Sequence, residues 1–395
     1  MTNHHAPQDL PAPAPDALAH SRRVEEHIRA AIQAAGGMIP FSRYMELALY
    51  APGLGYYSAG ARKFGAAGDF ITAPELSPLF SRCVARQCAE VLDEVPGGSI
   101  LELGAGSGIM AADLLLELQA LGKLPAEYLI LEVSADLRER QRQTLIAKAT
   151  ALASRVRWLD TLPDAFEGMV LGNEVLDALA VERFLKRPGG FDEYCVAGEG
   201  EGFAWTTRPA GEQLAATLAA FETTLAQPLQ PGYVSEINLG LMPLVSSLAA
   251  MLTRGALLLL DYGYPRAAYY HPERSMGTLM CHYRQRAHAD PFLYPGLQDI
   301  TAYVDFTAVA EAGTASGLEL AGYTTQAHFL MALGIADDVS AAGDRMSGAA
   351  LRALQQVKLL TLPDEMGERF KAIAFTRGVE TALRGFSLLD LSRQL

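Results

Sequence analysis

The chain has little cysteine and no sign of a structural metal site. Its 395 residues contain four cysteines, Cys83, Cys88, Cys195 and Cys281. They form no CxxC pair and have no histidine at zinc spacing, so neither a disulfide framework nor structural zinc is expected. Unpaired thiols are typical of a reducing compartment, and we therefore expect a cytoplasmic protein without a bound metal.

Long apolar runs are also missing. The longest apolar stretch, GALLLLDYGY at 255–264, is too short to span a bilayer and ends at an acid. Residues 1–20 lack a basic start and an apolar segment, so no secretory signal is predicted there. Their alternation of proline and alanine predicts a disordered tail, in which His4 and His5 have no third ligand.

Positive charge is scarce and dispersed. The formal net charge is −13, and arginines such as Arg138, Arg140 and Arg142 are interleaved with Glu139. A protein that binds nucleic acid needs its cations gathered on one face. We therefore expect no nucleic-acid partner.

The hydrophobic pattern predicts an α/β protein. Residues 21–95 have helical periodicity, with Ser21 as a predicted N-cap, and we expect an N-terminal helical subdomain there. It includes a glycine-rich segment expected to be a cofactor-covering loop. From residue 96 onward, short apolar runs such as SILEL and ALLLLDYG alternate with amphipathic stretches. This pattern is typical of a Rossmann-like, doubly wound parallel sheet in a core over 96–395. Segments at about 183–232 and 265–305 interrupt it, and we expect them to be insertions that form a cap.

The first apolar run ends in a glycine-rich turn that favours one cofactor class. The spacing is E-x-G-x-G-x-G, from Glu102 through Gly104 and Gly106 to Gly108, and it differs from the G-x-G-x-x-G of dinucleotide folds. A carboxylate beside a pyrophosphate would cost several kcal/mol, at the order-of-magnitude level, in a poorly solvated site. The turn therefore favours S-adenosylmethionine, which is cationic and carries no phosphate, over a dinucleotide.

Further cofactor contacts are predicted at the ends of the next two strands. Glu132 follows the second apolar run, where an acid binds ribose hydroxyls in dinucleotide folds, and Val133 adjoins it. Asp160 follows the third run and is an adenine-side candidate or, equally, a helix cap.

Longer stretches resemble a known family. YMELALYAPGLGYY, GDFITAPELSPLF, LELGAGSG, GNEVLDALAVERF and LLLLDYGYP, among others, cover nearly everything from 38 to 378. They resemble the MidA family of class I S-adenosylmethionine-dependent methyltransferases, whose mitochondrial members act as arginine methyltransferases in respiratory complex I assembly. The resemblance implies that family's fold and cofactor, a loop with Gly68, Asp69 and Phe70 closing over the cofactor, and Asn173 near the cofactor's amino-acid part.

Arginine methylation would need carboxylates that hold the guanidinium. Glu174 and Asp177 follow the fourth apolar run, and their i, i+3 spacing would place them on one face if a helix begins there. Glu174 could instead act with Glu75 or Asp69. For Asp177, the dipole of a starting helix is by itself a sufficient explanation.

We therefore expect a methyltransferase that acts on an arginine of a protein partner, with a respiratory complex I subunit as one possible client and a homodimer as one possible assembly. Two alternatives stay open at this point. One is a non-catalytic docking or assembly factor on the same fold. The other is a small-molecule methyltransferase, which the aromatic segment at 262–306 favours.

Overall fold

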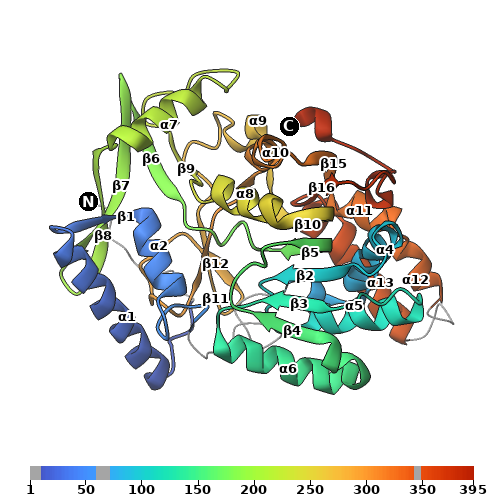
Figure 1. The fold of residues 1–395 in the computed structure, drawn as a ribbon. Helices are drawn as coiled ribbons and strands as arrows, with labels where there is room; N and C mark the ends of the chain where they lie inside the picture. Colours follow the sequence, from blue (N-terminus) through green and yellow to red (C-terminus); the bar gives the residue numbers. More distant parts are fainter. Residues whose placement is uncertain (1–9, 59–71, 342–347) are drawn as a thin grey trace. The chain divides into compact units, whose positions relative to one another are not determined.

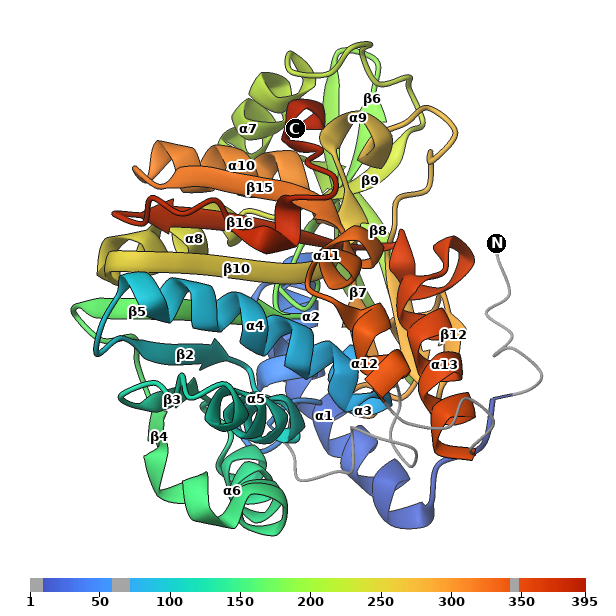
Figure 2. The same ribbon diagram turned by 90° about the vertical axis from the view of Figure 1, so that its right-hand side faces the viewer.

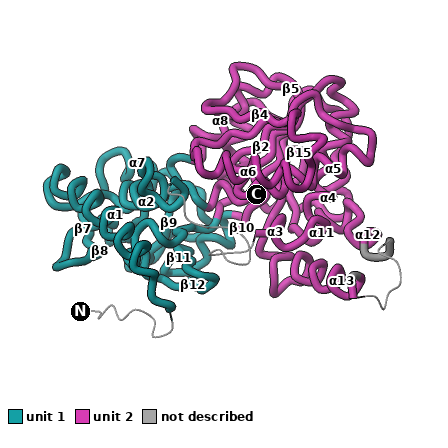
Figure 3. Tube along the Cα trace, turned by 90° about the horizontal axis from the view of Figure 1, so that it is seen from below, with its two compact units in different colours: residues 1–70, 178–240, 266–303 teal, residues 71–177, 241–265, 304–395 magenta. Residues whose placement is uncertain are grey.

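The computed structural model describes residues 10–58, 72–341 and 348–395. The chain divides into two compact units, coloured separately in Figure 3. Unit 1 comprises 1–70, 178–240 and 266–303, and unit 2 comprises 71–177, 241–265 and 304–395. Among the described helices, none is long and apolar enough to cross a bilayer.

Unit 2 is built on a sheet that, within the described residues, has the order β15-β16-β10-β5-β2-β3-β4, with β14 added beside β10. Strands β2, β3, β4, β5 and β10 are parallel, whereas β16 runs antiparallel to both of its neighbours. The strands are β2 (Ser99–Leu103), β3 (Tyr128–Leu131), β4 (Val156–Leu159), β5 (Phe166–Asn173), β10 (Leu252–Tyr264), β14 (Val304–Asp305), β15 (Glu319–Thr325) and β16 (Phe370–Arg377). The predicted doubly wound α/β fold is confirmed.

Helices cover both faces of this sheet. In Figure 2, α4 and α5 lie in front of the strands and α8 lies behind β10. The helices of unit 2 are α3 (Ala73–Leu76), α4 (Pro78–Glu94), α5 (Ile109–Ala120), α6 (Ala135–Ala149), α8 (Leu241–Met251), α10 (Phe306–Ala315), α11 (Gln326–Ala332), α12 (Ile335–Ala341) and α13 (Gly348–Thr361). Because the central strands are covered on both sides, β2, β3 and β10 contain runs that are nearly all apolar.

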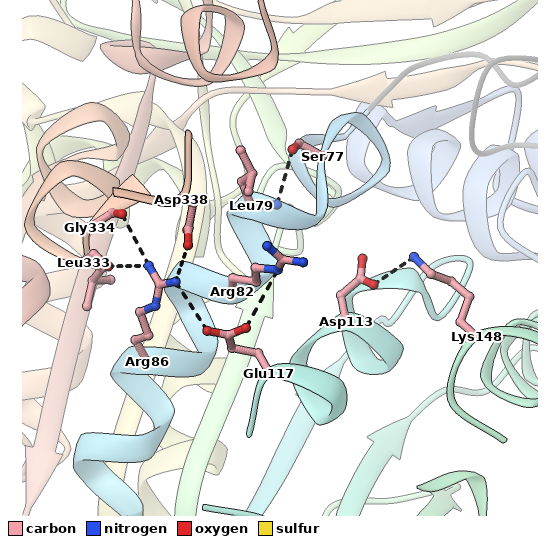
Figure 4. Close-up of polar contacts among 10 residues, drawn as sticks. All are labelled: Ser77, Leu79, Arg82, Arg86, Asp113, Glu117, Lys148, Leu333, Gly334 and Asp338. Carbon is pink, nitrogen blue, oxygen red and sulfur yellow. Dashed lines mark hydrogen bonds and ion pairs between the residues drawn. The ribbon is translucent and has the colours of Figure 1, made fainter. Parts of the chain in front are cut away.

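One arginine ties the helices of the front layer together, as Figure 4 shows. The Arg86 guanidinium of α4 lies 3.3 Å from the Glu117 carboxylate of α5 and 2.5 Å from the Asp338 carboxylate of α12. It also donates to the Leu333 carbonyl at the end of α11, at 2.9 Å. The Arg86 side chain is only 19% exposed, so these partners replace most of its water and fix α4 against its neighbours.

Unit 1 is a mixture of helices and antiparallel strands, drawn mainly in blue and yellow-green in Figure 1. One sheet has the order β1-β7-β6-β9 with β8 beside β7, and another has the order β12-β11-β13. Its elements are α1 (Pro15–Ala34), β1 (Met38–Pro40), α2 (Phe41–Tyr50), β6 (Glu182–Arg187), β7 (Gly190–Glu199), β8 (Gly202–Pro209), α7 (Glu212–Glu222), β9 (Val234–Ile237), α9 (Arg266–Tyr269), β11 (Met280–Tyr283), β12 (Arg286–His288) and β13 (Asp299–Thr301).

Two sequence predictions for the N-terminal region are wrong. Helix α1 begins at Pro15, so residues 15–20 are helical and do not belong to a disordered tail. Ser21 is buried inside this helix and donates to the Pro295 carbonyl at 3.0 Å, so it is not the N-cap. Proline favours the first helical turn because its missing N–H is not needed there.

The structure also divides the chain differently from the prediction. Helix α4 was expected to belong to an N-terminal subdomain ending near residue 95. It packs on α5 and belongs to unit 2, whose first residue is 71. The segments expected at 183–232 and 265–305 fall largely within unit 1, together with residues 1–70. The two predicted insertions thus share one compact unit with the start of the chain.

Candidate functional site

The strand order of unit 2 changes direction between β2 and β5. From β2 the chain proceeds outward through β3 and β4, and it then returns to place β5 and β10 on the other side. Ligands of such sheets bind beyond the carboxyl ends of the strands at this switch point. The turn after β2 and the loop after β5 are therefore the first places to look for a site.

The turn after β2 requires its glycines. Gly104, Gly106 and Gly108 have φ values of +59°, +53° and +80°, a region that other residues rarely adopt. Gly108 is also the residue that precedes α5, and a Cβ at that position would lie 2.9 Å from the Gln141 Cα in α6. Glycine is thus needed here both for the backbone conformation and for the close approach of α6.

Glu102, predicted to face the cofactor, lies inside the protein. It is 2% exposed, and its carboxylate accepts a hydrogen bond of 2.7 Å from the Tyr128 hydroxyl in β3. Burial raises the pKa of Glu102 to about 7; the neighbouring Glu132 carboxylate adds to the rise and the Tyr128 hydroxyl opposes it. Direct contact between Glu102 and a cofactor stays a prediction, and so buried a side chain leaves little surface for it.

Glu132 lies just past the end of β3 and is held in place by its neighbours. Its Oε1 accepts from the Ser134 amide at 2.9 Å, and its Oε2 accepts from the Gln141 amide nitrogen at 3.2 Å. The residue is 8% exposed. A carboxylate fixed in this way at the end of the second strand has the position in which dinucleotide folds bind ribose hydroxyls.

The two other candidates on this side of the sheet are open to solvent. Val133 is 78% exposed, although it directly follows a buried acid. The Asp160 side chain is 86% exposed and pairs with the Arg138 guanidinium at 2.7 Å. Arg138 also donates to the Glu132 carbonyl at 2.6 Å, so one arginine contacts both Asp160 and the residue that follows β3. The cofactor contacts of Val133 and Asp160 stay predictions.

The loop after β5 is not the helix start that the sequence suggested. Residues 174–180 form turns and bends, so the expectation that Glu174 and Asp177 share one helical face is wrong. Glu174 adopts a left-handed backbone conformation with φ +54°, and its amide donates to the Leu260 carbonyl of β10 at 2.8 Å. Asn173, the last residue of β5, donates to the Glu174 carboxylate at 3.2 Å.

An acid from β10 organises this loop. Asp261 is 1% exposed, and its Oδ2 accepts hydrogen bonds from the amides of residues 175–177 at 3.2, 2.8 and 3.2 Å. Burial, and next the carboxylates of Asp177 and Glu174, raise the pKa of Asp261. Because that effect requires proximity, the structure brings the two predicted catalytic acids together with a third that has no assigned role.

The two loops at the switch point adjoin each other. A Cβ at Gly104 would lie 3.7 Å from the Val175 Cγ2, which places the glycine turn beside the acidic loop. Glu75, the third predicted catalytic acid, belongs to α3 and accepts a hydrogen bond from the Ser107 hydroxyl in the glycine turn. The contact seen for Glu75 is therefore with the glycine turn.

Other predicted residues cannot be placed. Gly68, Asp69 and Phe70 lie outside the residues that the structure describes. Within the described residues, no group of histidine, cysteine or acidic side chains is arranged to hold a metal ion.

Sequence reasoning missed the roles of Gln141, Tyr128 and Asp261. Asp261 was noted only as the acid that ends its apolar run, which was the available signal for it. A glutamine within an amphipathic helix gives no such signal. Only the packing of α6 against the glycine turn reveals its position.

Comparisons with known proteins identify the family of the chain. A family model for S-adenosyl-L-methionine-dependent methyltransferases matches residues 83–324. A crystal structure from Burkholderia thailandensis, of a methyltransferase superfamily member bound to S-adenosylhomocysteine, is 50% identical with a TM-score of 0.93. It covers 98% of this chain and 100% of its own. A native structure from the same organism is 48% identical, with a TM-score of 0.91 and coverages of 98% and 100%.

Curated relatives are more distant. Protein arginine methyltransferase NDUFAF7 homolog, mitochondrial, from Drosophila melanogaster is 28% identical over 95% of this chain and 90% of its own length. Protein arginine methyltransferase NDUFAF7, mitochondrial, from Mus musculus is 28% identical over 86% of this chain and 81% of its own length. These mitochondrial relatives contradict the expected cytoplasmic location. The four cysteines are free and buried, and unpaired thiols do not distinguish one reducing compartment from another.

Proposed function

The chain belongs to the S-adenosyl-L-methionine-dependent methyltransferase family, and from this premise we propose that it methylates an arginine side chain of a partner protein. Its cofactor is S-adenosylmethionine, which supplies a methyl group from a sulfonium and leaves S-adenosylhomocysteine. The acceptor class is supported by the curated relatives, which are named as protein arginine methyltransferases.

We assign the cofactor to the edge of the sheet formed by β2 and β3. Backbone N–H groups at the start of α5, beside the glycine turn, suit the carboxylate of the cofactor's amino-acid part. Glu132 suits the ribose hydroxyls, because its carboxylate is fixed and accepts hydrogen bonds. Val133 offers an exposed apolar surface beside it that an adenine ring would cover. Asn173, at the end of β5, stays our candidate for the amino-acid part.

We assign the arginine to the loop after β5. Glu174 and Asp177 belong to a loop that Asp261 holds through three backbone amides. Carboxylates bind a guanidinium bidentately, which fixes its plane and leaves one nitrogen directed at the methyl group. The observation that carries the proposal is the adjacency of Gly104 and Val175. It brings the loop at 174–180, here called the acceptor loop, beside the glycine turn that we assign to the cofactor.

The chemistry asks for alignment and for the removal of one proton. A guanidinium nitrogen forms a bond to the methyl carbon while the carbon–sulfur bond breaks, so the sulfur keeps the bonding pair. The attacking nitrogen then loses a proton, and the methylated guanidinium keeps its single positive charge. Carboxylates of the acceptor loop localise electron density on the attacking nitrogen by binding the other N–H groups, and one of them can accept the released proton.

Proteome-wide mass spectrometry of methylarginine tests the proposal. Cells that lack the protein are compared with cells that carry the wild type, Glu174→Gln or Glu167→Gln. Glu167 is an exposed acid near the opposite end of β5 and serves as the matched control. We expect one or a few arginine sites to lose methylation both without the protein and with Glu174→Gln, and to keep it with Glu167→Gln.

The other outcomes identify the alternatives. An unchanged methylarginine profile in cells that lack the protein would favour a small-molecule acceptor. Full biological activity in Glu174→Gln, with cofactor binding retained, would instead favour a non-catalytic docking factor.

A further inference from the structure

Gln141 is a fully buried polar side chain in the middle of α6. Its exposed fraction is 0%, and both ends of its amide have partners. The amide oxygen accepts from the Trp158 indole N–H in β4 at 2.8 Å. The amide nitrogen donates to the Gly106 carbonyl at 3.1 Å and to the Glu132 Oε2 at 3.2 Å.

Trp158 fixes the direction of this amide. An indole N–H can only donate, so the end of the Gln141 amide that meets it must be the oxygen. The nitrogen end, with its two N–H groups, is then directed at the glycine turn and at Glu132. A single side chain therefore connects the ends of β2, β3 and β4.

Each of these contacts acts on a group assigned to the cofactor. The bond to Gly106 holds a turn whose glycines are all in the left-handed region. The bond to Glu132 occupies Oε2 and, together with the Ser134 amide on Oε1, sets the rotation of the carboxylate. The backbone of Gln141 also sits where a side chain at Gly108 would otherwise be.

We propose that Gln141 is a positioning residue that couples the glycine turn to Glu132 and thereby sets the preference for a cofactor that carries a ribose 2′-hydroxyl. The proposal rests on the cofactor site assigned above. Glutamate at this position would have nearly the same shape, but its carboxylate would face the Glu132 carboxylate and the Gly106 carbonyl, which also carries negative partial charge. The required feature is thus a neutral amide whose donor end points toward both.

The test is calorimetric titration of the full chain with S-adenosylhomocysteine and with its 2′-deoxyadenosyl analogue. The variants are Gln141→Ala, Gln141→Glu and Glu132→Ala, with Gln143→Ala as control. Gln143 is an exposed glutamine in the same helix whose amide donates to Glu139 at 3.0 Å. Melting temperatures and circular dichroism identify any variant that fails to fold, and Gln141→Glu, which keeps the side-chain volume, then replaces Gln141→Ala.

We expect Gln141→Ala to weaken binding of S-adenosylhomocysteine about 10- to 100-fold, since a hydrogen bond to a charged group is lost. The affinity for the 2′-deoxy analogue should fall clearly less, so that the ratio between the two affinities becomes smaller than in the wild type. Gln141→Glu should weaken binding at least as much, and Gln143→Ala should bind both ligands as the wild type does.

Equal losses for the two ligands would overturn the proposal, because a general disturbance of the helix would lower both affinities alike. Unchanged affinity in Gln141→Ala would overturn it as well. The result for Glu132→Ala separates this failure from a failure of the cofactor assignment. If that variant keeps the full preference for the 2′-hydroxyl, then Glu132 is not the ribose acid, and the assigned site is itself wrong.

Discussion

Replacing Glu102 by glutamine should stabilise the protein at alkaline pH. The carboxylate is buried beside Tyr128, and burial raises its pKa from 4.5 to about 7. Above that pH the folded protein must keep a negative charge away from water, whereas the unfolded chain exposes it. Glutamine has a similar shape and a carbonyl that can accept the Tyr128 hydroxyl, but it carries no charge at any pH.

The sign and size of the effect follow from the linkage between proton binding and folding. Between pH 4.5 and about 7 the folded state holds the Glu102 proton and the unfolded state does not, so the free energy of unfolding falls as the pH rises. The difference between a pKa of 4.5 and one of about 7 corresponds to about 3 kcal/mol. Because the amide nitrogen of glutamine must also find a partner, we expect a net gain of about 1 to 3 kcal/mol at pH 8.

Urea unfolding at pH 5, 6, 7 and 8, followed by tryptophan fluorescence, measures this difference. The advantage of Glu102→Gln over the wild type should be smallest at pH 5, should grow between pH 5 and 7, and should level off above pH 7. Glu127→Gln, which removes an exposed acid just before β3, should follow the wild type at every pH. Parallel pH profiles for wild type and Glu102→Gln would refute the reasoning. Since the carboxylate is 2% exposed, affinity for S-adenosylhomocysteine should change less than about threefold.

Three further substitutions test individual contacts. In urea unfolding and calorimetry, Gly108→Ala should lower the free energy of unfolding by about 2 kcal/mol or more and abolish cofactor binding, because it adds a clash to an unfavourable φ. Gly122→Ala, with φ +70° and open space around it, should lower the free energy of unfolding by only about 1 kcal/mol. Asp261→Ala should speed hydrogen exchange of the amides at 175–177 about tenfold or more by mass spectrometry, and unchanged exchange would mean that the acid does not hold the loop. Arg86→Ala should lower the free energy of unfolding, measured in urea, by about 2 kcal/mol, and Arg142→Ala, at an exposed position, by less than about 0.5 kcal/mol. Equal losses would contradict the stabilising role of the contacts of Arg86 with Glu117 and Asp338.

The central strands could be predicted from the sequence because burial determines the residues of each strand by itself. A strand that is buried on both faces must be apolar at nearly every position, so SILEL and ALLLLDYG are visible as β2 and β10 without any knowledge of their partners. The glycine turn was visible for the same reason, since three glycines at alternate positions indicate a backbone that other residues adopt only with strain.

The acceptor loop could not be predicted, because its conformation depends on a distant acid. The acids in GNEVLDAL fit a helix start, where unpaired N–H groups attract negative charge. In the folded protein, Asp261 supplies an acceptor for three amides in a row, about 85 residues further along the chain. With these amides satisfied from outside, the segment forms turns, and Glu174 can adopt a left-handed conformation.

The direction in which the Glu102 side chain points could not be predicted from the sequence either, because it also depends on a neighbouring strand. Alternation along β2 places residues 100 and 102 on one face, and the parallel register puts Tyr128 opposite Ile100. Glu102 therefore meets the tyrosine hydroxyl inside the layer covered by α4 and α5. Sequence spacing identified an acid at the end of the strand, but only the pairing register shows which way it faces.

The proposed reaction brings two cations together, and the acids at the ends of β5 and β10 would offset the repulsion between them. A sulfonium and a guanidinium aligned for transfer have their charges about 5 Å apart and repel each other by roughly 3 kcal/mol at an effective dielectric constant of about 20. Glu174, Asp177 and Asp261 lie close enough together for two of them to raise the pKa of the third, and a bound guanidinium would lower that pKa again. The mutual repulsion of these acids, unfavourable in the protein alone, thus favours binding of the cationic acceptor. Methyl transfer moves the sulfonium charge onto the acceptor nitrogen, and the proton that this nitrogen then gives to a carboxylate removes it, so one cation remains when the reaction is complete.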